Sequence, residues 1–164
     1  MGAKRVALIG HSGAGKSSCL TALGLDRKTA DMDAVLGTAH SPSLELALDW
    51  LVGTGSTPDI VVVSNHEQML IAMRTAKVAG LHAEKFSVVC FVYLRKPKDQ
   101  LQAHLKLPTA GGSIRKEDGQ RYTIDTYERF DHMFAQLADE TIDCSQRSVA
   151  DVAATIMELA LRIR

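Results

Sequence analysis

Short apolar runs alternate with segments of helical pattern along the chain. The runs at 59–64 and 86–94 lack polar alternation, which is typical of strands covered on both faces of a parallel sheet. The predicted strands are residues 6–9, 29–33, 59–64, 86–94 and 141–143. The predicted helices are residues 17–23, 43–52, 67–79, 98–105, 122–138 and 149–163. This alternation predicts an α/β fold with right-handed βαβ crossovers and a parallel sheet.

The apolar run at 6–9 leads directly into a glycine-rich loop. Residues 10–17 match Gly-x-x-x-x-Gly-Lys-Ser/Thr, the phosphate-binding P-loop or Walker A pattern. Glycines let backbone N–H groups converge on phosphate oxygens, and the following helix adds its own N–H groups and positive dipole end. We expect Lys16 to reach the β- and γ-phosphates and Ser17 to place its hydroxyl on Mg²⁺. The predicted nucleotide-binding residues of this loop are Gly13, Ala14, Gly15, Lys16, Ser17 and Ser18.

Polar side chains follow or end two further predicted strands. Asp31 and Asp33 lie in the segment 29–33, where alternation would place both on one side of an extended chain; helix capping is the alternative. Asn65 and His66 stand at the C-terminal end of the apolar run before them. Ligands bind at that edge of open α/β sheets, so both are candidate site residues. A helix-capping role for His66 is equally compatible with the sequence.

Two segments interrupt the regular pattern. We interpret residues 34–58, which include the helical stretch 43–52, as a small helical insert that forms the outer wall of an acceptor pocket. Residues 108–121 are polar, rich in glycine and contain Arg115. Because long loops in compact domains are often functional, we interpret this segment as a lid that carries a cation. A solvated surface loop is the alternative.

Composition agrees with one domain that spans residues 1–164. The chain is 46% hydrophobic and 23% charged, and its 19 Lys and Arg balance its 19 Asp and Glu. This balance gives no net field that would favour nucleic acid or an anionic membrane as a partner. With no apolar leader or spanning segment in the sequence, we expect a cytoplasmic protein, monomeric or homodimeric. The three cysteines show no Cys-x-x-Cys spacing, so the sequence predicts neither disulfides nor a zinc site.

The chain resembles the shikimate kinase-like branch of the P-loop small-molecule kinases, a group that includes gluconate and adenylate kinases. The matching motifs are residues 10–17, Asp31-Met32-Asp33, Tyr93-Leu94 and residues 138–148. The resemblance implies a three-layer P-loop NTPase fold with a five-stranded parallel sheet of order 2-3-1-4-5. It also implies ATP and Mg²⁺ as cofactors and a small hydroxylated molecule as the phosphoryl acceptor.

The resemblance further implies roles for single residues. Asp31 would help hold Mg²⁺ through water, together with the Ser17 hydroxyl. Asp33 would contact the acceptor hydroxyl, and Arg115 would approach the phosphates from the lid. Arg147 lies in the turn that borders the adenine in this family. The implied enzyme is an ATP-dependent phosphotransferase whose catalytic residues are Lys16, Asp33 and Arg115.

The acceptor side departs from the family. Three glycines of the family are replaced by the segment 64–66, and its Phe-Arg-x-x-Glu and Arg-Pro-Leu motifs are missing. No Lys or Arg occurs between Lys28 and Arg74. A desolvated anion without a partner costs several kcal/mol, so we expect an uncharged, hydroxyl-bearing acceptor rather than shikimate.

An uncharged acceptor would form hydrogen bonds with Asp33, Asn65 and His66, whereas an anionic acceptor would need a positive charge from Arg129 or from the lid.

Two other functions stay open. A nucleotide-hydrolysing switch is disfavoured, because Ser64 stands where a Walker B Asp would follow the strand and no Asn-Lys-x-Asp motif occurs. A nucleotide-binding regulatory or degenerate kinase is compatible with the altered acceptor region.

Overall fold

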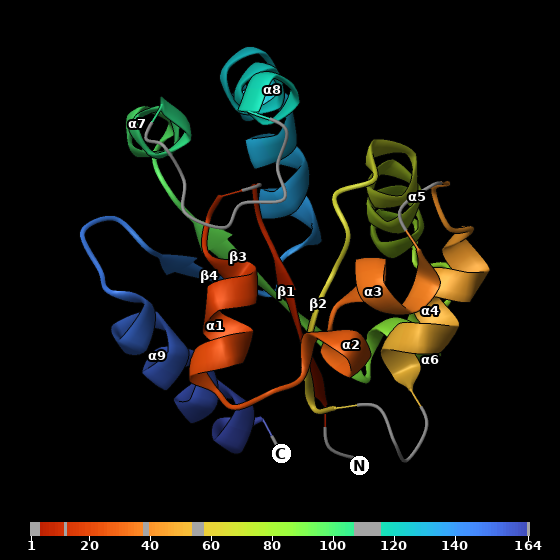
Figure 1. Cartoon of the computed structure of the whole chain (residues 1–164). Helices are drawn as coiled ribbons and strands as arrows, with labels where there is room; N and C mark the ends of the chain where they lie inside the picture. The colour runs from red at the N-terminus through yellow and green to blue at the C-terminus, as the bar shows by residue number, and fades with distance from the viewer. Residues whose placement is uncertain (1–3, 12, 38–39, 54–57, 107–115, 164) are drawn as a thin grey trace.

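The computed structural model describes residues 4–11, 13–37, 40–53, 58–106 and 116–163 (Figure 1). The strands are β1 (Arg5–Ile9), β2 (Ile60–Val62), β3 (Val89–Arg95) and β4 (Glu140–Asp143). The helices are α1 (Lys16–Ala22), α2 (Arg27–Ala30), α3 (Met32–Leu36), α4 (Leu44–Val52), α5 (Glu67–Val78), α6 (Ala83–Phe86), α7 (Lys98–Lys106), α8 (Lys116–Leu137) and α9 (Val149–Arg162).

The sheet is parallel and its strands lie in the order β2-β1-β3-β4. Strand β1 is central, and its Leu8 pairs with Val62 on one side and Val92 on the other. The prediction of an α/β fold with a parallel sheet is confirmed. The observed order equals the 3-1-4-5 part of the predicted order 2-3-1-4-5.

The predicted second strand at 29–33 is wrong. Most of these residues lie in α2 and α3, and Asp31 between them forms an isolated parallel bridge with Val62 at the outer side of β2. The carboxylate of Asp26 caps α2, and that of Asp31 caps α3, by accepting backbone N–H bonds. Caps of this kind satisfy donors at a helix start, which favours two short helices here. The sheet of the described residues therefore has four strands rather than five.

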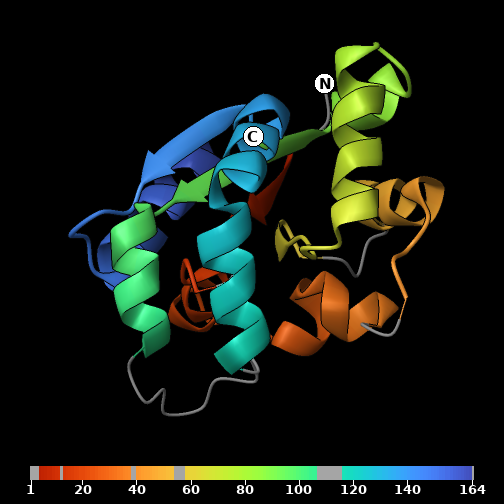
Figure 2. The same cartoon turned by 90° about the horizontal axis from the view of Figure 1, so that it is seen from above.

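Helices cover both faces of the sheet, so the predicted three-layer arrangement is confirmed (Figures 1 and 2). On one face, Leu8 packs in a core cluster with Leu20 of α1 and Ile156 of α9. On the other face, Ile9 packs in a second cluster to which α4, α5 and α8 contribute, including Phe134. Alternate residues of β1 point to opposite faces, which explains why a central strand must be apolar throughout.

The helical part of the predicted insert is confirmed, and part of the predicted lid is corrected. Helix α4 occupies most of the stretch 43–52, and the Ser43 hydroxyl caps it by accepting from Leu46 N at 3.2 Å. Residues 116–121, expected in the lid loop, belong to α8, which packs beside α7 (Figure 2). The predicted lid cation Arg115 lies outside the described residues.

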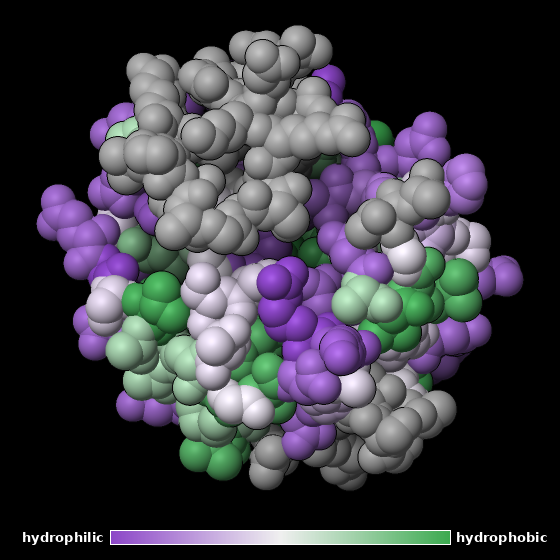
Figure 3. Space-filling model, in the orientation of Figure 1, coloured by the Kyte–Doolittle hydropathy of each residue, from purple (hydrophilic) through white to green (hydrophobic). Residues whose placement is uncertain are grey.

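The surface, the cysteines and the helices add three findings. In the orientation of Figure 1, hydrophilic residues gather over α2, whose Arg27 and Lys28 are exposed (Figure 3). All three cysteines are buried thiols with no disulfide, as predicted. Among the described residues, no helix is both long and apolar enough to span a membrane.

Candidate functional site

The glycine-rich loop that follows β1 has no room for a side chain at its first residue, Gly10. Gly10 has φ 153°, and a Cβ at this position would stand 2.8 Å from the carbonyl oxygen of Leu94 in β3. Gly15, with φ 94°, precedes α1, and no side chain caps that helix. The first N–H groups of α1 are therefore oriented out of the helix start with no side-chain acceptor, which is the arrangement that phosphate binding requires.

Lys16 lies at the centre of this loop and is almost fully buried, with 9% exposure. Its Nζ donates to the carbonyl oxygens of Gly10 and His11. Burial lowers the pKa of Lys16 to about 8, although the nearby carboxylates of Asp31 and Asp33 favour its charged form. Backbone carbonyls thus stabilise the Lys16 ammonium group only in part, and a bound anion would stabilise it further.

Asp31 and Asp33 reach the site from α3 and not from an extended strand. Asp31 is 5% exposed, and its carboxylate accepts from Asp33 N at 3.0 Å and lies 3.5 Å from the Arg27 guanidinium. The bridge to Val62 fixes this turn against β2. Both carboxylates therefore stand at the C-terminal edge of the sheet, close enough to Lys16 to affect its pKa.

The Asp33 carboxylate meets the end of β2 from α3, and not from the end of a second strand as expected. Ser64 Oγ donates to Asp33 Oδ1 at 2.5 Å, and His66 Nε2 lies 3.8 Å from the same oxygen. His66 occupies the N-cap position of α5, but its side chain makes no capping hydrogen bond. Asn65, which lies between Ser64 and His66 in the sequence, is half-buried. Ser64 is the site residue that the sequence interpretation overlooked; its position directly after the apolar run was the available signal.

The other predicted cations lie around this edge and are engaged by the protein. Arg129 of α8 lies 3.1 Å from Glu67 at the start of α5, in a solvent-exposed ion pair. Arg147, in the turn after β4, donates to Asp151 O at 3.1 Å and to Thr155 Oγ1 at 2.5 Å. These bonds hold the Arg147 side chain against α9.

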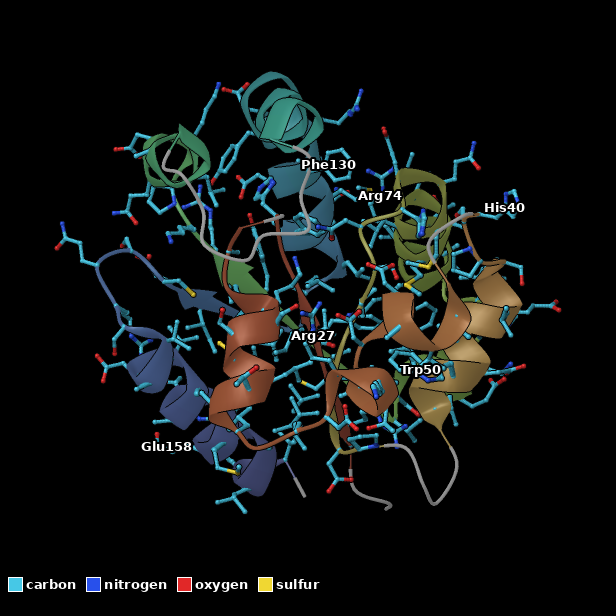
Figure 4. All side chains as sticks on the ribbon, in the orientation of Figure 1. Arg27, His40, Trp50, Arg74, Phe130 and Glu158 are labelled. Carbon is cyan, nitrogen blue, oxygen red and sulfur yellow. The ribbon has the colours of Figure 1, made fainter. Side chains whose placement is uncertain are left out.

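His40, in the predicted insert, lies at the outer edge of the molecule (Figure 4). Its imidazole is exposed and far to the side of the loop that carries Lys16. The structure therefore does not bring His40 to the sheet edge, in contrast to His66.

A buried histidine connects the loop to α8. The His11 ring is fully buried and stacks on Tyr127 with centroids 4.2 Å apart and an interplanar angle of 10°. The edge of Phe134 stands against it at 5.2 Å. Burial, with a smaller effect of the Lys16 charge, lowers the pKa of His11 to about 4. His11 is therefore neutral at physiological pH and acts as part of the aromatic core beneath the loop.

Asp131 organises a polar network beside this aromatic group. It accepts from the Tyr93 hydroxyl at 2.5 Å and from Arg95 Nε at 3.0 Å. The Tyr127 hydroxyl donates to Lys96 O at 2.8 Å. Burial and the Asp131 carboxylate raise the pKa of Tyr93, so its phenol stays protonated. The network joins the end of β3 to α8, and Tyr127 of α8 contacts the loop by stacking on His11.

The donor set at the loop fits Mg²⁺ in one specific way. Ser17, in the first turn of α1, and Asp31 carry oxygen atoms, the ligand type that Mg²⁺ prefers, and would be the residues that hold the ion. No cluster of three or more His, Cys, Asp or Glu side chains among the described residues could hold a metal by itself. A Mg²⁺ ion here would therefore take the rest of its coordination from phosphate oxygens and water, as is common for nucleotide-bound Mg²⁺.

The fold is similar to that of a solved kinase. The structure of shikimate kinase from Acinetobacter baumannii in complex with shikimate matches with a TM-score of 0.57 at 15% sequence identity. The match covers 97% of this chain and 93% of that chain. No protein-family model and no curated protein matches the sequence. At this identity the likeness concerns the fold alone: the chain is similar in fold to a shikimate kinase.

Proposed function

We propose that the protein is an ATP-dependent phosphotransferase that moves the γ-phosphoryl group of ATP to a hydroxyl of a small molecule. The observation that supports this best is the meeting of Lys16 with Asp31 and Asp33 at one edge of the sheet. Charge compensation by a cation and a carboxylate-bound metal is what phosphoryl transfer requires. The fold shared with a shikimate kinase agrees with this proposal.

ATP would bind with its phosphates on the loop backbone. The proposed phosphate contacts are the N–H groups of Gly13, Ala14, Gly15, Lys16, Ser17 and Ser18. Mg²⁺, held by Ser17 and Asp31, would supply charge neutralisation at the β- and γ-phosphates. Arg147 would border the adenine, and Arg115 would add a cation over the transferring group.

The proposed acceptor is an uncharged, hydroxyl-bearing molecule, contacted by Asp33, Asn65 and His66. Carboxylate, amide and imidazole groups bind hydroxyls directly and offer no fixed positive charge. Two arginines near this side already face carboxylates of the protein: Arg27 lies by Asp31 and Arg129 by Glu67. Arg129, whose ion pair with Glu67 is exposed, stays our candidate counter-charge for an anionic acceptor. We therefore propose that shikimate is a poor acceptor.

The test is an ADP-formation screen with Mg·ATP. The neutral compounds are glycerol, D-ribose, D-glucose, myo-inositol and adenosine, and the anions are shikimate, gluconate and AMP. We expect turnover with a neutral compound and a kcat about 100-fold lower in Lys16→Met, because a transition-state donor of this kind contributes about that factor. Lys85→Met is the matched control, since Lys85 lies on the far surface and pairs with Asp49.

Two results would contradict the proposal. Equal ADP formation by the wild type and Lys16→Met would show that the loop does not catalyse the transfer. Efficient phosphorylation of an anion such as shikimate, lost in Asp33→Asn, would show that the acceptor class is wrong while the kinase activity is right.

A further inference from the structure

Ser64 is a buried hydroxyl at the end of β2. Its side chain is 2% exposed, and the preceding Val63 N donates to Leu8 O at 3.0 Å, so the backbone here still belongs to the sheet. A buried hydroxyl without a partner is costly, which restricts its direction. Ser64 Oγ donates to Asp33 Oδ1 at 2.5 Å. The rigid sheet edge thus holds one oxygen of the Asp33 carboxylate.

Asp33 is fixed at a second point and remains accessible. Its N–H donates to Asp31 Oδ1 at 3.0 Å, which anchors its backbone in the first turn of α3. Its side chain is nevertheless 43% exposed. Within the described part of the chain, Ser64 and His66 both approach Oδ1 and not Oδ2. This leaves Oδ2 without a contact from either residue.

Ser64, and not His66, sets the orientation of this carboxylate. His66 Nε2 lies 3.8 Å from Oδ1, which is too long for a hydrogen bond, whereas the Ser64 contact is short and buried. A hydroxyl that donates to a carboxylate makes one of the stronger hydrogen bonds in proteins.

We propose that Ser64 is a positioning residue of the phosphotransfer reaction: it holds Asp33 Oδ1 so that Oδ2 accepts the hydrogen bond of the acceptor hydroxyl. The inference rests on the proposed kinase function. In the reaction, the acceptor oxygen forms a bond to the γ-phosphorus of ATP, and its proton passes to Asp33 Oδ2. The bond from the γ-phosphorus to the bridging oxygen breaks, and ADP leaves with that electron pair.

The experiment compares Ser64→Ala, Ser64→Thr and Asp33→Asn with the wild type, using the neutral acceptors of the screen. We expect Ser64→Ala to lower kcat by about tenfold with the KM for ATP changed less than twofold, because misorientation affects transfer and not nucleotide binding. Ser64→Thr keeps a hydroxyl and should recover kcat to within about threefold of the wild type. Ser64→Ala should add nothing to Asp33→Asn, since both act through one carboxylate.

A second readout does not depend on turnover. The ¹³Cγ resonance of Asp33 should move in Ser64→Ala and stay unchanged in Ser87→Ala, whose exposed hydroxyl donates to Glu84 O far from this site. An unmoved Asp33 resonance, a wild-type kcat in Ser64→Ala, or a Ser64→Thr enzyme as slow as Ser64→Ala would each overturn the role of Ser64 alone. If the wild type forms no ADP with any acceptor, the proposed function fails, and this inference fails with it.

Discussion

On the proposed function, the affinity for Mg·ATP should fall as the pH rises through 8, because the charged form of Lys16 would be the one that binds phosphate. In the free protein, burial lowers the pKa of Lys16 to about 8. Bound phosphates place negative charge beside the ammonium and raise its pKa, so ATP binding above pH 8 requires proton uptake. Phosphate groups are themselves fully ionised in this range and do not add a comparable slope.

The size of this effect follows from the two protonation states. With a pKa of about 8, roughly 90% of free molecules carry a charged Lys16 at pH 7, and roughly 10% do at pH 9. The Kd for Mg·ATP should therefore rise about tenfold between these pH values, which corresponds to about 1.4 kcal/mol. In Lys16→Met the binding should be weaker and should not change with pH over this interval.

Isothermal titration calorimetry measures both quantities. Titrations at pH 7, 8 and 9 give Kd, and repeating them in buffers of different ionisation enthalpy gives the number of protons taken up. Lys85→Met, which removes a half-buried ammonium paired with Asp49, should follow the wild type. The reasoning is wrong if the wild-type Kd is constant from pH 7 to 9, or if Lys16→Met shows the same pH dependence as the wild type.

Two further predictions concern stability. Gly10→Ala should lower the free energy of unfolding by about 2 kcal/mol in urea denaturation, because its Cβ would stand 2.8 Å from the Leu94 carbonyl oxygen and force the backbone to shift; an unchanged midpoint would contradict this contact. The pKa of His11 is about 4 in the folded protein against 6.5 unfolded, so the unfolded chain takes up the proton first as the pH falls. Stability should drop by about 2 kcal/mol from pH 7 to 5, and His11→Phe, which keeps a ring against Tyr127, should lack that part of the loss.

The sequence predicted those strands whose pattern of apolar residues depends on burial alone. Strands such as β3 contact helices on both faces, and their continuous apolar runs are hard to interpret otherwise. The segment 29–33 was ambiguous, because Ala30 and Met32 alternate with polar residues and are both buried in the structure. Two short helices with apolar inner residues give the same pattern. The caps at Asp26 and Asp31 decided the outcome, and their effect depends on backbone conformation that a pattern of hydrophobicity does not contain.

In the candidate site, as in the fold, some features could be predicted from the sequence and others could not. The conformation of the loop was predictable because the Gly-x-x-x-x-Gly-Lys-Ser pattern fixes the positions of its glycines and of Lys16, whereas phosphate binding there stays a prediction. The approach of Asp33 to His66 was expected from a strand at 29–33 beside β2, but helix α3 brings Asp33 there instead, so the structural reason for the expectation was wrong. The hydrogen bond from Ser64 and the pairing of Arg129 with Glu67 were not predictable, since each joins residues that are distant in sequence and approach one another through tertiary packing.

The protonation of Lys16 links the stability of the free protein to its proposed activity. The pKa falls from 10.5 to about 8 on folding, so folding disfavours the charged form by about 3 kcal/mol relative to the neutral form. Since the unfolded chain binds more protons between these values, the free protein should gain stability as the pH rises from 8 toward 10.5. A bound triphosphate reverses this cost, because it pairs with the ammonium that the loop carbonyls stabilise incompletely. The buried Lys16 charge thus lowers the stability of the free protein, whereas a bound anion makes the same charge favourable. A site can in this way gain affinity for an anion from a residue that destabilises the unliganded fold.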